Sequence, residues 1–199
     1  MLLVPFLLVV GLAASTAFGA TDIIELDDNS DQINLANHIE YQIDSSGQLT
    51  VNDMQASSRR SLWQHPVKVS DSISFGYTQD IYWFHFRLKN IGTHTIRKQL
   101  EIGYPVLDYI DVFQLFDNGN SVSHSMGDKR PFLDRPVRHR NFILPLQLHA
   151  GDLLDVYIRV HTTSSMQLPI MLWRDTSLLE AAQSQMLGLF LWGDRARAR

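Results

Sequence analysis

Hydrophobic and polar residues alternate with a period of two along most of the chain after residue 72. Successive side chains of a β-strand point to opposite faces of a sheet, so each alternating run predicts a strand with one buried and one solvated face. The runs cover residues 82–88, 96–102, 142–148, 154–160 and 166–172. In the run at 96–102, Lys98 is the one charged residue among the hydrophobic positions.

Residues 106–116 are apolar in both phases of the alternation, which indicates a central strand. This segment ends at Asp117-Asn118-Gly119. Asn-Gly favours a tight hairpin turn, because both residues tolerate positive φ. Pro145 and Pro169 lack a backbone N–H, so we expect their strands at sheet edges or at bulges.

Many short strands separated by turns predict an all-β fold, a β-sandwich whose strands could wind as a jelly roll. We expect this sandwich to form one domain at residues 21–175. About 150 residues are enough to build such a core without disulfides. The hydrophobic period then changes: Ser177 and Glu180 fit a capping box, and hydrophobic residues follow at helical spacing, so a C-terminal helix is expected within 176–199.

The N-terminus has the features of an export signal. Residues 2–14 form a stretch without charge. This stretch is too short for a membrane span and has the length typical of a signal-peptide core. Small residues near 15–19 offer cleavage sites, so residues 1–20 are expected to be a signal peptide and the mature chain periplasmic. The alternative is a buried N-terminal strand or helix. Residues 22–43 are mixed and predict no definite element, whereas 55–60 predict a loop or short helical turn.

Composition excludes several classes of function. There are no cysteines, which rules out disulfides and thiolate metal sites. The 17 Lys and Arg residues are outnumbered by 21 Asp and Glu, which argues against a nucleic-acid binder. The sequence has no Gly-rich phosphate loop, no HExxH motif and no GxSxG elbow, and its eight histidines include no i, i+4 pair. We therefore expect a non-catalytic protein without metal or cofactor.

A few polar and aromatic residues still allow a sugar-related role. Asp108 and Asp111 resemble glycosidase carboxylates, but the favoured interpretation is that each bonds nearby backbone or arginine. Trp63, Trp83 and Trp173 could stack on a sugar ring, although core packing is the commoner fate of tryptophans on strands.

The strongest local signal is a basic cluster at residues 127–140, which we call the basic segment. Pro131 and Pro136 stiffen it, and Asp128 and Asp134 could pair with two of its cations. Three interpretations stay open: a network of ion pairs that ties a long loop to the sandwich, a site for an anionic or polyhydroxylated ligand, and an interface with another domain or with lipid headgroups. The residues expected to contact ligand are Arg130, Arg135, His139, Arg140 and Asn141, with Trp83 as a stacking surface.

Four characteristic stretches follow one another along the chain: GYTQDIYWFHFRLKN (76–90), LEIGYPVLDYIDVFQL (100–115), GDKRPFLDRPVRHRNFILPL (127–146) and YIRVHTTSSMQLPIMLW (157–173). In this order they resemble the type-two extracellular domain of bacterial seven-transmembrane receptors with diverse intracellular signalling modules. The resemblance implies a periplasmic jelly roll that binds carbohydrate or a related small molecule. It also implies seven downstream membrane helices and an output module, often a diguanylate cyclase or a histidine kinase.

The resemblance places the start of a membrane helix near residues 188–190, but Trp192-Gly193-Asp194-Arg195 interrupts it. We therefore expect a truncated or frame-shifted product, or a stand-alone sensor fragment, of a receptor that is membrane-attached when intact. The expected partners are a small ligand, the membrane through the downstream helices, and a homodimeric copy. Two rival interpretations remain: a secreted glycan-active enzyme or its accessory module, and a structural docking domain.

Overall fold

The computed structural model describes residues 22–66, 68–69 and 72–175. The predicted signal peptide and C-terminal helix lie outside these ranges. Within them most of the regular structure is β, which confirms the all-β class. The strands are β1 (Ile23–Leu26), β2 (Gln32–Asn34), β3 (Glu40–Asp44), β4 (Lys68–Val69), β5 (Ser72–Tyr77), β6 (Ile81–Asn90), β7 (Ile96–Ile102), β8 (Tyr109–Phe116), β9 (Ser121–Met126), β10 (Phe142–Leu148), β11 (Leu153–His161), β12 (Ser165–Leu168) and β13 (Ile170–Arg174).

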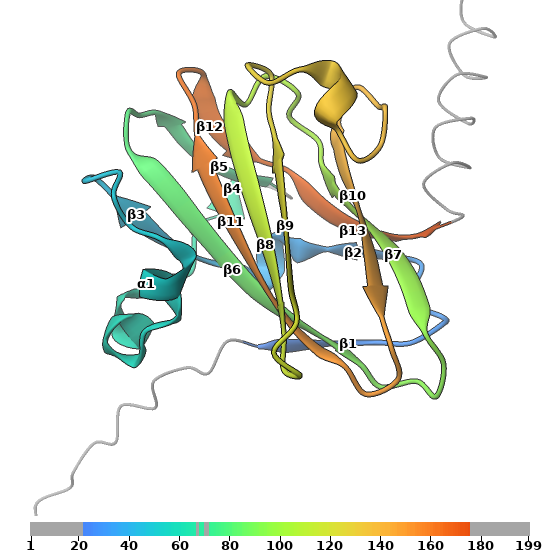
Figure 1. Cartoon of the computed structure of the whole chain (residues 1–199). Helices are drawn as coiled ribbons and strands as arrows, with labels where there is room; N and C mark the ends of the chain where they lie inside the picture. The colour runs from blue at the N-terminus through green and yellow to red at the C-terminus, as the bar shows by residue number, and fades with distance from the viewer. Residues whose placement is uncertain (1–21, 67, 70–71, 176–199) are drawn as a thin grey trace, which may run out of the picture.

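The strands form two large sheets and one small sheet (Figure 1). The six-stranded sheet has the order β1-β6-β11-β8-β9, and β3 also pairs with β6. The four-stranded sheet has the order β10-β7-β13-β2, and the small sheet has the order β12-β5-β4. The two large sheets face each other, and their inner faces together supply most of one hydrophobic core.

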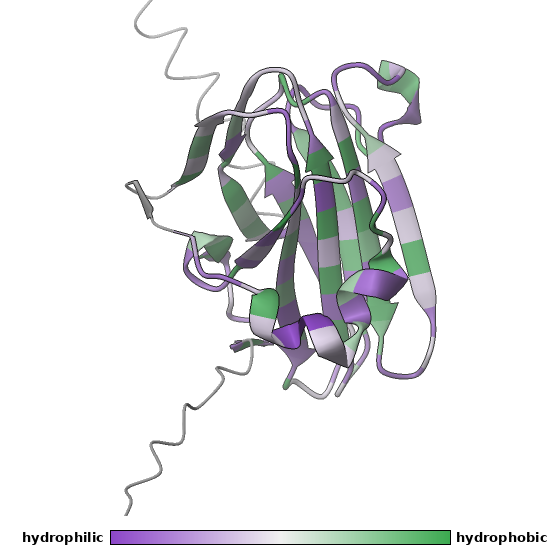
Figure 2. Cartoon of the chain, turned by 90° about the vertical axis from the view of Figure 1, so that its left-hand side faces the viewer, coloured by the Kyte–Doolittle hydropathy of each residue, from purple (hydrophilic) through white to green (hydrophobic). Residues whose placement is uncertain are grey.

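The predicted alternation decides which residues fill this core. Phe84 and Ile158 from the six-stranded sheet, and Leu100 and Leu144 from the four-stranded sheet, are all at most 1% exposed. Figure 2 shows the resulting green and purple bands along the strands. Each such side chain contributes on the order of 1.5–3 kcal/mol by leaving water, so burial of these faces is the main force that holds the sheets together.

Both prolines act as expected, and one of them divides a predicted strand. Pro145 lies in β10, an edge strand of its sheet. Pro169 separates β12 from β13, which belong to different sheets, so the single run expected at 166–172 is two strands. The predicted hairpin joins β8 to β9 and has Gly119 at φ 86°. β8 begins at Tyr109, three residues after the start of the apolar segment.

The outer face of β6 departs from the simple pattern. Trp83 is 1% exposed and His85 is 5% exposed, although both lie on the face that alternation predicts as solvated. A short helical segment covers them, α1 (Val51–Gln55) followed by η2 (Ser57–Leu62), which projects from the sheet in Figure 1. Met54 of α1 belongs to a second, smaller core with Trp83 and Tyr157.

Local hydrogen bonds fix the start of this covering segment. After β3 the chain turns at Gly47, where φ is 68°. Asp44 accepts hydrogen bonds from the backbone N–H groups of Gly47 (2.8 Å) and Leu49 (3.0 Å). Thr50 and Asp53 then form a capping box, in which each side chain accepts the backbone N–H of the other. The turn and the cap together direct α1 onto the outer face of the sheet.

Candidate functional site: a cavity on the outer face of the six-stranded sheet

The register of the six-stranded sheet places four side chains in one row on its outer face. Glu40 of β3 lies opposite His85 of β6, His85 lies opposite Tyr157 of β11, and Tyr157 lies opposite Phe113 of β8. Directly opposed side chains on one face of a sheet are close enough to interact. The row therefore joins residues from four segments that are far apart in the sequence.

A cavity of about 530 Å³ lies at this row, and we call it the sheet-face cavity. The sheet forms its floor, and the segment from α1 to Trp63 forms one wall. Its size is within the range of small-molecule sites. The lining residues are Glu40, Met54, Gln55, Ala56, Arg60, Trp63, His85, Arg87, Leu115, Phe116, Asp117, Asp155 and Tyr157.

His85 is held between two carboxylates. Its Nδ1 lies 2.8 Å from Oε1 of Glu40, and its Nε2 lies 2.8 Å from Oδ1 of Asp155. Only a protonated imidazole can donate from both nitrogens. Burial alone would lower the pKa of His85, but the hydrogen bonds and negative charges of Asp155 and Glu40 outweigh it and raise the pKa above 6.5. Arg87 also binds Asp155, with Nε 3.1 Å from Oδ1.

Aromatic rings pack around this ion group. Tyr157 stacks on His85 with ring centroids 4.3 Å apart and an interplanar angle of 18°. Trp63 lies 5.3 Å from His85 and 6.0 Å from Tyr157, and it is half-buried. Burial and the nearby carboxylates raise the pKa of Tyr157, so its hydroxyl stays neutral. The cavity thus combines a partly exposed indole with fixed polar groups, an arrangement suited to a ring-shaped polar ligand.

The charges of the sheet-face cavity nearly balance. Glu40, Asp117 and Asp155 are acidic, whereas Arg60, Arg87 and protonated His85 are basic. This balance favours a neutral polar ligand over an anion. Glu40 and Asp155 are bridged by one imidazole, so they do not form the open carboxylate pair of a glycosidase. In the described part of the chain, no cluster of three or more His, Asp or Glu side chains could hold a metal ion.

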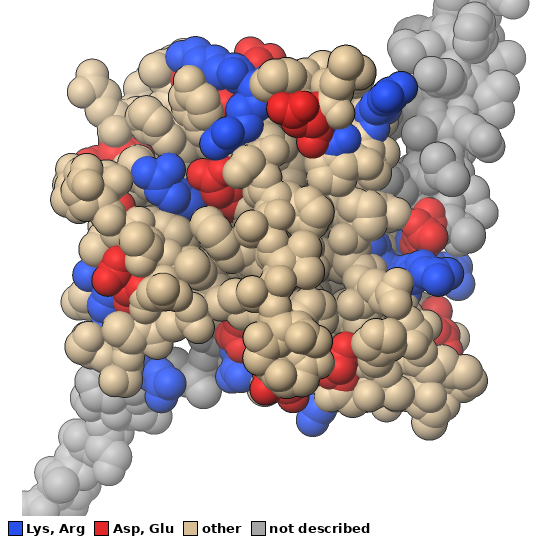
Figure 3. All heavy atoms as spheres, viewed as in Figure 1, with Lys and Arg blue, Asp and Glu red and all other residues tan. Residues whose placement is uncertain are grey.

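The basic segment contributes no side chain to this cavity. Arg130 binds Asp111, with Nη2 3.0 Å from Oδ1, and its guanidinium lies 5.5 Å from the centre of the Tyr109 ring. Lys129 Nζ lies 2.9 Å from Oδ2 of Asp108. Figure 3 shows the Lys and Arg side chains at the top of the view next to Asp and Glu. These contacts are the ion pairs that the first of the three interpretations expected.

The second half of the basic segment is tied mainly to itself. Arg135 Nη1 donates to the carbonyls of His139 and Arg140, each at 2.9 Å. Its guanidinium also lies 4.9 Å from the ring centre of Phe132 and 4.5 Å from that of Phe142. The side chain of Arg140 is exposed. A ligand role for the segment stays a prediction, while the visible contacts of Arg135 hold the loop in shape.

Asn141 and His139 close the loop onto the sheets. The Asn141 side-chain amide donates to Oε1 of Glu101 at 2.6 Å, and its backbone N–H donates to Nδ1 of His139 at 3.1 Å. Trp173 donates from Nε1 to the other oxygen of Glu101 at 2.8 Å. Glu101 therefore anchors both the end of the loop and β13.

The expectation of a stacking surface at Trp83 requires correction. Its side chain is 1% exposed and packs against Phe113, with ring centroids 5.8 Å apart. The covering segment with Met54 closes the face that would meet a sugar. Core packing, the alternative allowed by the sequence, is therefore what the structure shows.

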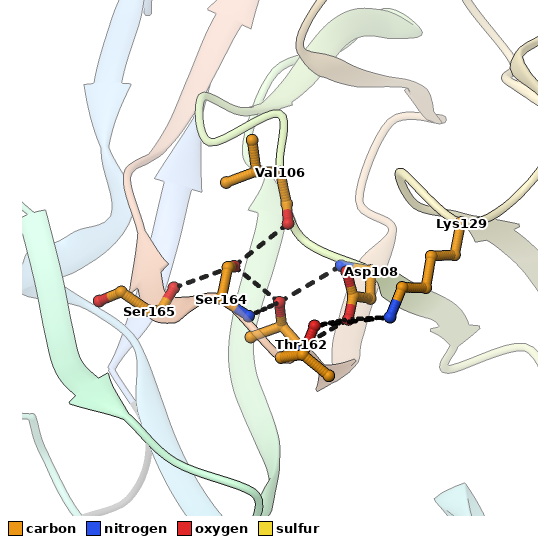
Figure 4. A network of polar contacts seen from close by, with 7 residues as sticks. Val106, Asp108, Lys129, Thr162, Ser164 and Ser165 are labelled. Carbon is orange, nitrogen blue, oxygen red and sulfur yellow. Dashed lines mark hydrogen bonds and ion pairs between the residues drawn. The ribbon is translucent and has the colours of Figure 1, made fainter.

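Asp108 and Asp111 occupy the structural positions that the sequence favoured. Asp108 is buried and accepts hydrogen bonds from the backbone N–H of Thr163 (2.8 Å), from its hydroxyl (2.7 Å) and from Lys129 (Figure 4). These bonds lower the pKa of Asp108 despite its burial. Thr162 and Ser164 extend the network to the carbonyl of Val106. The network joins three loops at one end of the sandwich.

A matched pair of variants tests the structural role of Arg135 in the basic segment. Arg135→Ala should lower the free energy of unfolding by about 1–3 kcal/mol, because two hydrogen bonds and two ring contacts are lost. Arg140→Ala should change it by less than about 0.5 kcal/mol, because that side chain is exposed. Urea unfolding followed by circular dichroism measures both. Equal stability of the two variants would contradict the structural role of Arg135.

Sequence reasoning missed the Glu40–His85–Asp155 group. Glu40 lies in the stretch that predicted no definite element, and His85 lies at a position expected to be solvated. The three residues are separated by 45 and 70 positions, so only the strand register brings them together. The alternation did place His85 and Asp155 on the polar face of their strands, which was the one available signal.

Comparison with known families and structures gives one clear result. The family model described as 7TMR-DISM extracellular 2 matches residues 36–174, which is most of the chain. A search of curated proteins finds no match. In the described ranges, no helix is long and apolar enough to cross a membrane.

Solved structures resemble this chain only distantly. A Bacillus thuringiensis Cry1Da tryptic core variant has a TM-score of 0.33 and 9% identity, over 77% of this chain and 24% of that one. A family GH115 4-O-methyl-alpha-glucuronidase has a TM-score of 0.29 and 12% identity, over 52% and 14%. An exo-beta-1,3-galactanase from Phanerochaete chrysosporium has a TM-score of 0.28 and 10% identity, over 51% and 25%. This chain spans at most a quarter of each of these proteins.

Proposed function

Because this chain belongs to the 7TMR-DISM extracellular 2 family, whose members are extracellular sensor domains of seven-transmembrane receptors, we propose that it senses a small ligand in the sheet-face cavity. The observation that carries the proposal is the convergence of fixed polar groups and a half-buried indole in one cavity of about 530 Å³. Ligand sites are concave and combine apolar walls with a few convergent polar groups. The basic segment contributes no residue to this cavity.

The ligand class that fits best is a neutral polyhydroxylated molecule, such as a carbohydrate. Trp63 offers a ring face, and Arg60 and Asp117 are exposed at the cavity and can exchange hydrogen bonds with hydroxyl groups. A small anion, the other class expected from the sequence, would meet three carboxylates as well as three cations in the same space, so it would gain no net attraction. The near balance of charge therefore supports a neutral ligand.

Binding can change the shape of the domain because the cavity has two kinds of wall. Arg60 lies in η2, and Trp63 follows it directly. Arg87 and Asp155 lie on the sheet. A ligand that touches both sides would hold the covering segment against the sheet. Ligand can shift a receptor only if it binds one arrangement better than another, and a bridging position meets this requirement.

The finer features of the receptor complete the proposal. The domain is exported to the periplasm by residues 1–20, its strands wind as a jelly roll, and the intact parent carries membrane helices after the domain. The output module is a diguanylate cyclase or a histidine kinase. β13 is the last strand of the matched region, so a signal would leave the domain at Arg174.

Thermal-shift screening tests the proposed site. We expect neutral mono- or disaccharides to raise the melting temperature more than sugar acids or small carboxylates do. Trp63→Ala should weaken binding of the best compound about tenfold through loss of ring stacking. Arg60→Ala should weaken it as well, whereas the control Arg140→Ala should not.

Two results would contradict the proposal. One is that no compound of these classes stabilises the protein. The other is that binding survives both cavity substitutions and is lost in Arg140→Ala, which would move the site to the basic segment.

A further inference from the structure

The outer strand of the six-stranded sheet has an open edge. β9 pairs with β8 from Ser121 to Met126 without any shift of register, and no described strand pairs with its other side. Such an edge presents a row of backbone N–H and C=O groups that can pair with another chain.

Other described edges are short, interrupted or covered. β10 contains Pro145, which cannot donate to a neighbouring strand. β2 has three residues and β4 has two. The outer edge of β3 carries a bridge between Tyr41 and Gln64. β9 has six residues and contains no proline, Lys, Arg, Asp or Glu, so it lacks the usual protections of an edge strand.

The hairpin geometry shows which residues of β9 face the open side. Phe116 N–H donates to the carbonyl of Asn120 at 2.9 Å, and Gly119 N–H donates to the carbonyl of Phe116 at 3.0 Å. Hydrogen-bonded pairs alternate along an antiparallel ladder, so the backbone groups of Val122 and His124 point toward β8. Those of Ser121, Ser123 and Ser125 point outward.

The sequence of β9 is nearly symmetric about Ser123. Val122 and His124 flank it on the inner face, and Ser121 and Ser125 flank it on the outer face. Two such strands in antiparallel register would pair Ser123 with itself, Ser121 with Ser125, and Val122 with His124. Small hydroxyl side chains fit this pairing, and Val122, which is 45% exposed, would gain a neighbour. Figure 3 shows uncharged surface over the middle of β9.

We propose that β9 is a dimerisation edge, on which β9 of a second copy of this chain pairs in antiparallel register about a two-fold axis at Ser123. The antiparallel pair is self-complementary, as a symmetric dimer requires. It joins the two six-stranded sheets into one continuous sheet and leaves both sheet-face cavities free, because β9 contributes no residue to them. This proposal is independent of the ligand.

The size of the contact sets the expected affinity. A single strand pair buries less area than a standard interface, so the free protein should dimerise with a Kd on the order of 100 µM. Sedimentation analysis of the chain from roughly 10 µM to 1 mM should therefore show a mass that rises from monomer to dimer.

Substitutions at Ser123 test the register. Ser123→Pro removes only an outward N–H, so it should keep the melting temperature of the wild type and stay monomeric at every concentration. Ser123→Thr keeps that N–H and should still dimerise. Ser123→Lys places two like charges across the two-fold axis, so its dimer should weaken about tenfold and recover as salt screens the charges.

A cross-link provides a test that does not depend on the proline variant folding. The chain has no cysteines, so Ser123→Cys introduces a unique thiol. Under oxidation at high protein concentration it should form a covalent dimer, whereas Thr93→Cys in an exposed loop should not. The proposal is overturned if the wild type stays monomeric throughout, if Ser123→Pro dimerises as the wild type does, or if both cysteine variants cross-link equally.

Discussion

Replacement of Gly127 by alanine should destabilise the domain by about 4 kcal/mol or more, enough to unfold many domains of this size. Gly127 has φ 148°, a conformation that side-chain-bearing residues rarely adopt. An added Cβ would lie 2.1 Å from the carbonyl oxygen of Asp108 and 2.7 Å from its carbonyl carbon. These are backbone atoms, so they cannot rotate away as a flexible side chain would.

The chain offers a matched control for this substitution. Gly119 also has positive φ, 86°, but no atom lies within 4 Å of the position of its Cβ. Gly119→Ala should therefore cost only about 1 kcal/mol, the conformational penalty alone. Thermal and urea unfolding of the two variants measure the difference. Similar losses at both positions would show that the contact between Gly127 and Asp108 is not what fixes the basic segment.

Replacement of His85 by leucine should cost about 3–5 kcal/mol, because it leaves the buried carboxylate of Glu40 without the imidazolium that pairs with it. The carboxylate of Glu40 is 6% exposed and pairs with Nδ1 of His85, so the substitution would remove this pairing from the protein interior. Asp155 would keep Arg87. A second change, Glu40→Gln in the His85→Leu background, removes the buried charge and should restore part of the loss. Urea unfolding of the three proteins measures this coupling.

The same group predicts how stability depends on pH. His85 has a pKa raised above 6.5 in the folded state, so the native protein holds its proton more tightly than the unfolded chain does. Its contribution is complete below pH 6.5 and is lost as the pH rises through the folded pKa. Between pH 6 and pH 9 the wild type should therefore lose stability relative to His85→Leu. A constant difference between them over this range would show that folding does not raise the pKa of His85.

The large core could be predicted from the sequence because alternation is a local signal. Phe84, Leu100, Leu144 and Ile158 fill the core at the positions where the period of two puts them. Lys98 shows the limit of this signal. It is 2% exposed among hydrophobic residues, and its amine donates to the carbonyls of Asp27 and Ser30. Those acceptors lie in a stretch that has no periodic pattern, so the carbonyls that satisfy this buried amine could not be predicted.

The candidate site could not be predicted from a local sequence pattern, because its residues come together only in the folded sheet. The basic segment attracts notice because its charges are adjacent in the sequence, but its ion-pair partners lie elsewhere, Asp108 directly before β8 and Asp111 in β8. The sheet-face cavity depends on the register of four strands, β3, β6, β11 and β8, and on the covering of their outer face by α1. Neither the pairing of β3 with β6 nor the position of that helix follows from hydrophobic periodicity.

The most direct test of the central claim is a crystal structure of the chain with the compound that stabilises it most in the sugar screen. We predict electron density for the compound in the sheet-face cavity, stacked on Trp63 and hydrogen-bonded to Arg60 or Arg87. Density for the compound against the basic segment, with the cavity filled only by solvent, would contradict the account.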